Sequence, residues 1–147
     1  MKAVVSTKTS NGSAATTPAG EQDAQIIEFP AGLPGFEGCR RFILVVSDEL
    51  KPLAYLRSLD PPEPSFLTVD PLIIDPQYDL TLREFERARL GAAANEPLVW
   101  LSIVTILNGT ATANLRAPVV LNPRRMVGCQ FIRDDRDYSV DFPLGKA

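Results

Sequence analysis

Apolar residues occur along the chain in short runs, each ended by a turn rich in proline, glycine or asparagine. Runs of this length, rich in β-branched and aromatic residues, predict strands. Asn108-Gly109 is the strongest short hairpin signal in the chain, so the strands on its two sides are expected to pair antiparallel. The strands expected from these runs span 26–29, 42–46, 53–59, 65–69, 98–107, 110–115, 119–121, 126–132 and 138–142.

Two further segments complete the expected elements. Leu72-Ile73-Ile74 lies between prolines, which restricts it to an edge strand or a strand end. One short helix is predicted with Thr81 as N-cap, Glu84 completing a capping box and Gly91 ending the helix. Many short strands with one helix predict a mainly β fold, a single antiparallel barrel-like domain with one short helix.

Composition divides the chain in two. Residues 1–22 are dominated by serine, threonine, alanine and glycine without apolar periodicity, which predicts a disordered N-terminal tail, with the folded domain over residues 23–147. We expect no membrane contact, because the longest apolar run, 98–107, falls well short of the roughly 20 residues that a spanning helix needs. No targeting segment is recognisable, and the expected location is the cytoplasm.

The absence of histidine from all 147 residues removes the common catalytic triads and histidine-ligated metal centres. The two cysteines, Cys39 and Cys129, are too few for a disulfide scaffold or a thiolate cluster and are expected to be buried thiols. Carboxylate chemistry survives these absences, but eighteen acidic residues make a carboxylate pair a nonspecific signal, so we expect no enzyme activity, no metal and no cofactor. The formal net charge of −3 gives no overall attraction for nucleic acid. Aspartates alternate with the arginines that gather in the C-terminal third, which is typical of a solvated, salt-bridged face; these arginines are Arg116, Arg124, Arg125, Arg133 and Arg136.

The segment from residue 60 to residue 79 contains acidic residues and prolines but no lysine or arginine. A rigid acidic surface would select a basic protein partner at a low ordering cost. Aspartate is also ordinary turn chemistry beside proline, so both interpretations stay open. The candidate partner-binding residues here are Glu63, Asp70, Asp75 and Asp79.

Two other motifs predict structural roles. The run from Phe29 to Glu37 has a Gly-Leu-Pro-Gly centre that requires a specific tight turn, which apolar side chains would fix to the core. A second run, 112–122, contains the polar Asn114 in an apolar setting. This side chain needs hydrogen-bond partners, so we expect it to fix a turn or loop. The structural residues of these motifs are Phe29, Pro30, Gly32, Leu33, Pro34, Gly35, Phe36, Asn114, Pro118 and Asn122.

Residues 27–37, 103–106 and 112–122 together resemble, in the same order, the FliW family of flagellar assembly factors. The resemblance implies a small cytoplasmic β-barrel-like protein without catalysis. It also implies two protein partners: flagellin before its export, and the translational regulator CsrA, whose repression of flagellin mRNA the freed protein relieves. The residues alone leave two other classes open, an oligonucleotide- or carbohydrate-binding β-barrel and a carboxylate hydrolase.

Overall fold

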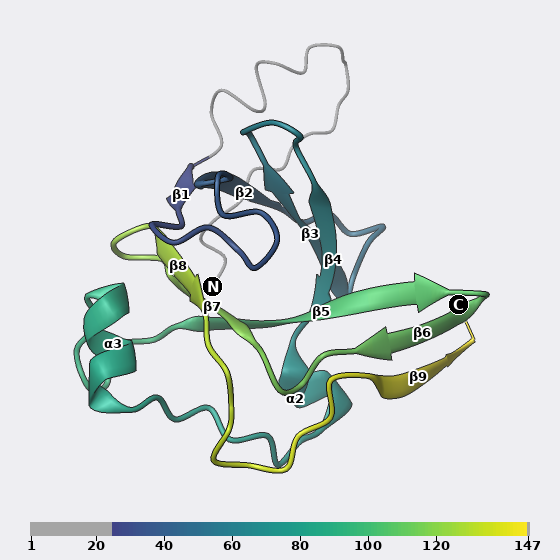
Figure 1. Ribbon diagram of the computed structural model, residues 1–147. Coiled ribbons are helices and arrows are strands. Elements are labelled where there is room, and N and C mark those ends of the chain that lie inside the picture. The colour runs from purple at the N-terminus through teal and green to yellow at the C-terminus, as the bar shows by residue number, and fades with distance from the viewer. Residues whose placement is uncertain (1–24, 147) are drawn as a thin grey trace.

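The computed structural model describes residues 25–146, and the expected tail over 1–22 lies outside the described residues. The described chain is mainly β, with nine strands in one sheet and two short helices (Figure 1). The elements are β1 (Ile27–Glu28), β2 (Arg41–Val45), β3 (Leu53–Ser58), β4 (Ser65–Val69), α2 (Pro71–Ile74), α3 (Glu84–Leu90), β5 (Val99–Leu107), β6 (Thr110–Ala113), β7 (Val119–Asn122), β8 (Val127–Gln130) and β9 (Phe142–Lys146).

The sheet closes on itself because β5 pairs with strands on both of its sides. The strand order is β4-β3-β2-β1-β8-β7-β5-β6-β9, and an additional pairing of β4 with β5 closes a barrel of 7 strands. All strand pairs are antiparallel except β1 with β8, which pair in parallel through Glu28 and Val127. The predicted antiparallel barrel-like fold is confirmed.

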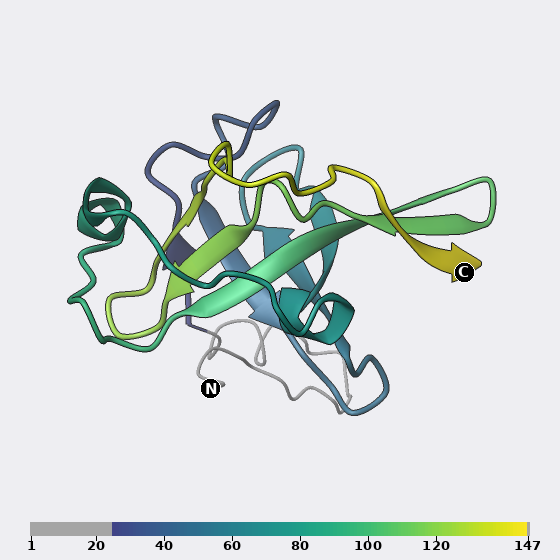
Figure 2. The same cartoon turned by 90° about the horizontal axis from the view of Figure 1, so that it is seen from below.

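Strand β5 is longer than the barrel needs, and its second half leaves the barrel. Its first residues, Val99 to Leu101, pair with β7, and its last residues, Val104 to Leu107, pair with β6. Strand β9 adds to the other side of β6. The last part of β5 therefore forms, with β6 and β9, a three-stranded arm that projects from the barrel in both views (Figures 1 and 2).

The barrel interior holds the main hydrophobic core. Alternate residues of each strand point inward, as the period of a β-strand requires. Phe42 and Leu44 of β2 and Leu56 of β3 belong to this core, and the ring centres of Phe29 and Phe42 lie 4.7 Å apart in it. The core cluster comprises Ile27, Phe29, Leu33, Cys39, Phe42, Leu44, Ala54, Leu56, Leu101, Val119 and Leu121.

The segment 71–98, which includes both helices, crosses the outer surface of the barrel beside β5 (Figure 2). One part of it packs Tyr78, Leu82 and Leu90 against Trp100 and Val120, which point outward from β5 and β7. Near α2, a smaller cluster of Val69, Val104, Ala111 and Ala113 receives Ile74 of the helix. The barrel thus has apolar side chains on both faces along β5, which explains the near-continuous apolar sequence of this strand.

Two expectations about local structure are wrong. Leu72 to Ile74 form a helical turn rather than a strand, because Asp70 caps the first turn and Pro71 occupies a position where proline is compatible with a helix. The longer helix begins at Glu84, with Arg83 as N-cap, two residues after the predicted cap. Its predicted end is confirmed, since Gly91 has the left-handed φ of 63°.

The last strand also differs from the prediction. It was expected at 138–142 but begins at Phe142, because the ring of Tyr138 stacks on Tyr78 at 4.5 Å and holds this part of the chain against the segment that covers the barrel. Both cysteines are free and buried, as expected.

Candidate functional site

The acidic segment 60–79 does not form one continuous surface. Glu63 lies in the turn between β3 and β4 with a left-handed φ of 59°, whereas Asp70, Asp75 and Asp79 follow β4. A strand of the length of β4 spans about 16 Å. The structure therefore separates Glu63 from the other three candidate residues and gathers those three along α2 and the chain that follows it.

Asp70 and Asp75 flank the single turn of α2. The Asp70 carboxylate accepts a hydrogen bond from the backbone nitrogen of Leu72 at 2.9 Å, and the Asp75 carboxylate accepts one from the backbone nitrogen of Gln77 at 3.0 Å. Within residues 25–146, neither carboxylate forms an ion pair. Each therefore stabilises a turn and also leaves a negative charge that no cation of the described chain neutralises.

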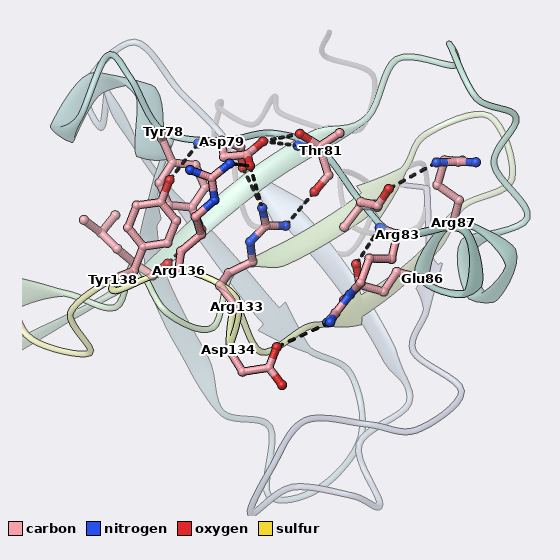
Figure 3. Close-up of polar contacts among 12 residues, drawn as sticks. Tyr78, Asp79, Thr81, Arg83, Glu86, Arg87, Arg133, Asp134, Arg136 and Tyr138 are labelled. Atoms are coloured by element: carbon pink, nitrogen blue, oxygen red, sulfur yellow. Dashed lines mark hydrogen bonds and ion pairs between the residues drawn. The ribbon is translucent and has the colours of Figure 1, made fainter.

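Asp79 has a different environment, which Figure 3 shows. Its carboxylate accepts hydrogen bonds from the backbone nitrogen and the hydroxyl of Thr81, and it pairs with Arg136 and with Arg133, the latter at 3.5 Å. The hydrogen bond from the Thr81 hydroxyl, together with the two arginines, lowers the pKa of Asp79 below its usual value of 3.8. Its charge is thus compensated within the protein.

Arg133 is the buried partner in this cluster. Its guanidinium donates hydrogen bonds to the backbone oxygens of Thr81 at 2.7 Å and Asp79 at 3.1 Å, and it lies over the Trp100 ring at 5.5 Å from the ring centre. A buried guanidinium is tolerated only when it is paired and hydrogen-bonded in this way. Arg133 therefore fastens the segment that follows α2 to the outside of the barrel.

Two tyrosines strengthen the same attachment. The Tyr78 hydroxyl donates to the backbone oxygen of Leu115 at 2.7 Å, and the Tyr138 hydroxyl accepts from the backbone nitrogen of Asp79 at 2.9 Å. Burial raises the pKa of Tyr78, so this hydroxyl stays protonated as the donor. These contacts join positions far apart in sequence and hold the chain after α2 in one place.

Sequence reasoning placed Arg133 on a solvated face, and this is wrong because its side chain is buried. One signal was available in the sequence. Phe131 and Arg133 are two residues apart, and in an extended chain such residues share a face, so a buried Phe131 implies a buried Arg133. The other arginines follow the expectation more closely, since Arg83 and Arg124 form ion pairs with Asp134 and Glu96.

Asp60, at the start of the acidic segment, is also compensated. Arg41 donates two side-chain hydrogen bonds to it, at 3.0 Å and 2.8 Å, and the backbone nitrogens of Arg40 and Arg41 donate two more. These hydrogen bonds, the Arg41 side chain first, lower the pKa of Asp60. Within residues 25–146, the carboxylates of the segment that lack an ion-pair partner are therefore the exposed Glu63 and Asp70 and the half-buried Asp75.

The motif around Gly32 forms a tight turn that packs against the barrel core. Gly32 and Gly35 have φ values of 66° and 86°. An isolated antiparallel β-bridge joins Leu33 to Phe36 across the turn. Phe29 and Leu33 are buried in the core, and the half-buried Phe36 packs against it. Pro30 and Pro34 lie exposed in the same turn. The apolar side chains of the motif therefore attach this turn to the core.

The two asparagines of the second motif also fix loops. The Asn114 side-chain oxygen accepts from the backbone nitrogens of Arg116 and Ala117, both at 3.0 Å, in the loop before the buried Pro118. Asn122 is fully buried and donates to the backbone oxygen of Leu90 at 2.8 Å, which ties the end of α3 to the turn after β7. The side-chain oxygen of Asn114 and the side-chain nitrogen of the buried Asn122 thus have the hydrogen-bond partners that such settings require.

The described residues contain no group of three or more cysteine, aspartate or glutamate side chains placed to hold a metal ion. Within the same residues, none of the helices has the length and apolar character needed to cross a membrane. The distinctive surface is instead α2, whose two flanking carboxylates are uncompensated and whose outward side chains, Leu72 and Ile73, are apolar and exposed.

Comparison with known proteins agrees with this architecture. The family model described as FliW protein matches residues 13–144. The flagellar assembly factor FliW of Thermotoga petrophila is 36% identical over 121 residues, covering 80% of this chain and 81% of the relative, and that of Natranaerobius thermophilus is 32% identical over 123 residues, covering 82% of each. A crystal structure of the flagellar assembly factor FliW superposes with a TM-score of 0.74 at 28% identity, covering 81% of this chain and 84% of that one.

The fold and these matches define a small β-barrel protein of the flagellar assembly factor class. The chain belongs to the FliW family.

Proposed function

We propose that this chain is a non-enzymatic regulator that binds flagellin in the cytoplasm and antagonises CsrA, relieving repression of flagellin synthesis. The observation that carries the proposal is the family match over residues 13–144. Binding of flagellin and of CsrA would be negatively coupled, so that export of flagellin frees the protein to capture CsrA. The rate of flagellin synthesis is then set by the amount of flagellin that awaits export.

We place the contact with CsrA on the acidic segment. Glu63, Asp70 and Asp75 are exposed or partly exposed carboxylates without an ion-pair partner in residues 25–146. Such charges attract a basic surface and repel RNA that would bind to the same surface. Asp79 contributes indirectly, because its charge is already matched by two arginines and its contacts hold the chain after α2 in position.

The double variant Asp70→Asn/Asp75→Asn tests this contact. Asparagine keeps the side-chain oxygen that accepts the capping hydrogen bond, so the turns should remain. An exposed ion pair contributes about 1 kcal/mol or less to binding. Loss of two such pairs should therefore lower CsrA affinity by about tenfold, and the affinity should depend less on salt concentration. Titration calorimetry at two salt concentrations measures both effects.

The matched control is Asp48→Asn/Glu49→Gln, which removes the same number of charges from the exposed turn between β2 and β3. It should leave CsrA affinity within about twofold of wild type. Equal weakening by the control would mean that only net charge matters, and unchanged affinity in the α2 variant would place the contact elsewhere.

A further inference from the structure

Helix α3 lies at the end of the molecule opposite the arm, and in both views no other element of residues 25–146 lies outside it (Figures 1 and 2). Two of its side chains, Glu86 and Leu90, are buried. Four others are exposed, and their spacings of three and four residues place them on one face of the helix. These residues are Glu84, Phe85, Ala88 and Arg89, which we call the α3 face.

Phe85 is the apolar centre of the α3 face. Its side chain is 60% exposed, more than any other aromatic side chain in residues 25–146. The Arg83 guanidinium lies over the Phe85 ring at 5.2 Å from the ring centre, and ion pairs with Glu86 at 2.9 Å and Asp134 at 3.4 Å hold that guanidinium in place. An exposed aromatic ring that is already ordered loses little entropy when a partner covers it, which favours a role in binding.

Uncompensated charges of opposite sign lie on the two sides of Phe85. Glu84 precedes it and Arg89 follows it by one turn, and within residues 25–146 neither side chain forms an ion pair. The Arg89 guanidinium lies over the Phe131 ring at 5.6 Å from the ring centre, which holds it beside the helix. The helix dipole favours this order of charges, but it does not account for an exposed phenylalanine between them. The α3 face is therefore acidic at one end, basic at the other and apolar between them.

A face with this order of charges is complementary to a second copy of itself. A two-fold axis between two antiparallel helices makes each contact occur twice, with the two residues of a contact exchanged between the copies. In the register that places Phe85 of one copy opposite Ala88 of the other, Glu84 lies opposite Arg89. The small side chain of Ala88 lets the two helices approach closely around the ring. One register therefore satisfies the apolar centre and both charged ends.

We propose that the α3 face pairs antiparallel with the α3 face of a second copy of this chain, through two contacts of Phe85 with Ala88 and two ion pairs of Glu84 with Arg89. The helix has 7 residues and rises about 10 Å, so the contact is smaller than the interfaces of stable complexes. The association is accordingly weak and reversible, with a dissociation constant of about 0.1 mM. Helix α2 lies apart from α3 in both views, so pairing leaves the carboxylates that flank α2 accessible.

Sedimentation equilibrium of the full chain between about 10 μM and about 1 mM measures this association. Phe85→Ser removes the apolar centre and should weaken the association by about tenfold or more. Glu84→Arg and Arg89→Glu each place like charges opposite one another twice across the axis, and each should also weaken it by about tenfold. The double variant Glu84→Arg/Arg89→Glu exchanges the two charges, so it should associate to within about threefold of wild type.

The matched control is Leu107→Ser, because Leu107 is 69% exposed on the arm, at the other end of the molecule, and its loss should leave the association within about twofold of wild type. Circular dichroism establishes that each variant is folded, since both charge variants oppose the helix dipole. Phe85→Ser keeps the charges and decides the question alone if a charge variant does not fold. A wild-type chain that stays monomeric at about 1 mM, equal association by wild type and Phe85→Ser, equal weakening by Leu107→Ser, or a folded double variant that associates no better than the single charge variants would overturn the proposal.

Discussion

Replacing Gly32 by alanine should destabilise the barrel far more than the same change at Gly35. Both glycines have a positive φ, 66° and 86°, so alanine at either position meets the left-handed penalty of about 1 kcal/mol. Their surroundings differ. A β-carbon at Gly32 would lie 2.7 Å from the Cα and the oxygen of Glu37 and 2.7 Å from the oxygen of Phe36, whereas one at Gly35 would have nothing within 4 Å.

The overlap at Gly32 involves backbone atoms, so it cannot be relieved by rotating a side chain. Moving the backbone of the turn costs about 2 kcal/mol in addition to the conformational penalty. Gly32→Ala should therefore lower the free energy of unfolding by about 3 kcal/mol, and Gly35→Ala by about 1 kcal/mol.

Urea denaturation followed by the fluorescence of the single tryptophan measures this difference. With a slope of about 1.5 kcal/mol per molar urea, the midpoint should fall by about 2 M for Gly32→Ala and about 0.7 M for Gly35→Ala. Equal midpoints for the two variants, or a larger loss at Gly35, would refute the assignment of a close backbone approach to Gly32.

Three other predictions concern the attachment of the covering segment and the tail. Because the pKa of Asp79 lies below 3.8 in the folded protein, its contribution to stability is complete above that value and is lost as pH falls through the folded pKa; acid unfolding of Asp79→Asn should accordingly depend less on pH. Arg133→Met should cost about 3 kcal/mol by urea denaturation, because it leaves buried acceptors unpaired, whereas the exposed Arg136→Gln should cost under about 1 kcal/mol. Deletion of residues 1–22 should leave cooperative thermal unfolding and partner binding unchanged; loss of cooperativity would show that the tail supplies structure.

The strands were predictable because the local preference of their residues for extended backbone agrees with the conformation that the fold requires. Ser65 to Val69 was predicted with the bounds that the structure has, and the hairpin at Asn108-Gly109 joins β5 to β6 as expected. Gly91 ends α3 because glycine is favoured in the left-handed conformation that the C-cap requires. At these positions local chemistry alone determines the conformation.

The α2 turn and the buried arginine were not predictable in the same way. Three apolar residues are too few to distinguish a strand from a helical turn by periodicity, and the cap supplied by Asp70 decides between them. Asp79 and Arg133 are 54 residues apart in sequence, so their pairing follows from the barrel topology and not from local pattern. The sequence therefore indicated a uniformly negative segment. In the structure, arginines from elsewhere in the chain compensate the charges of Asp60 and Asp79.

The most direct test of the account is the affinity of CsrA for the full chain, measured by titration calorimetry with and without saturating flagellin. The account predicts that each partner binds alone and that flagellin weakens CsrA binding by about tenfold or more, with a reciprocal effect of CsrA on flagellin. CsrA affinity that does not change when flagellin is bound would contradict the coupling, and failure of either protein to bind would contradict the proposed function itself.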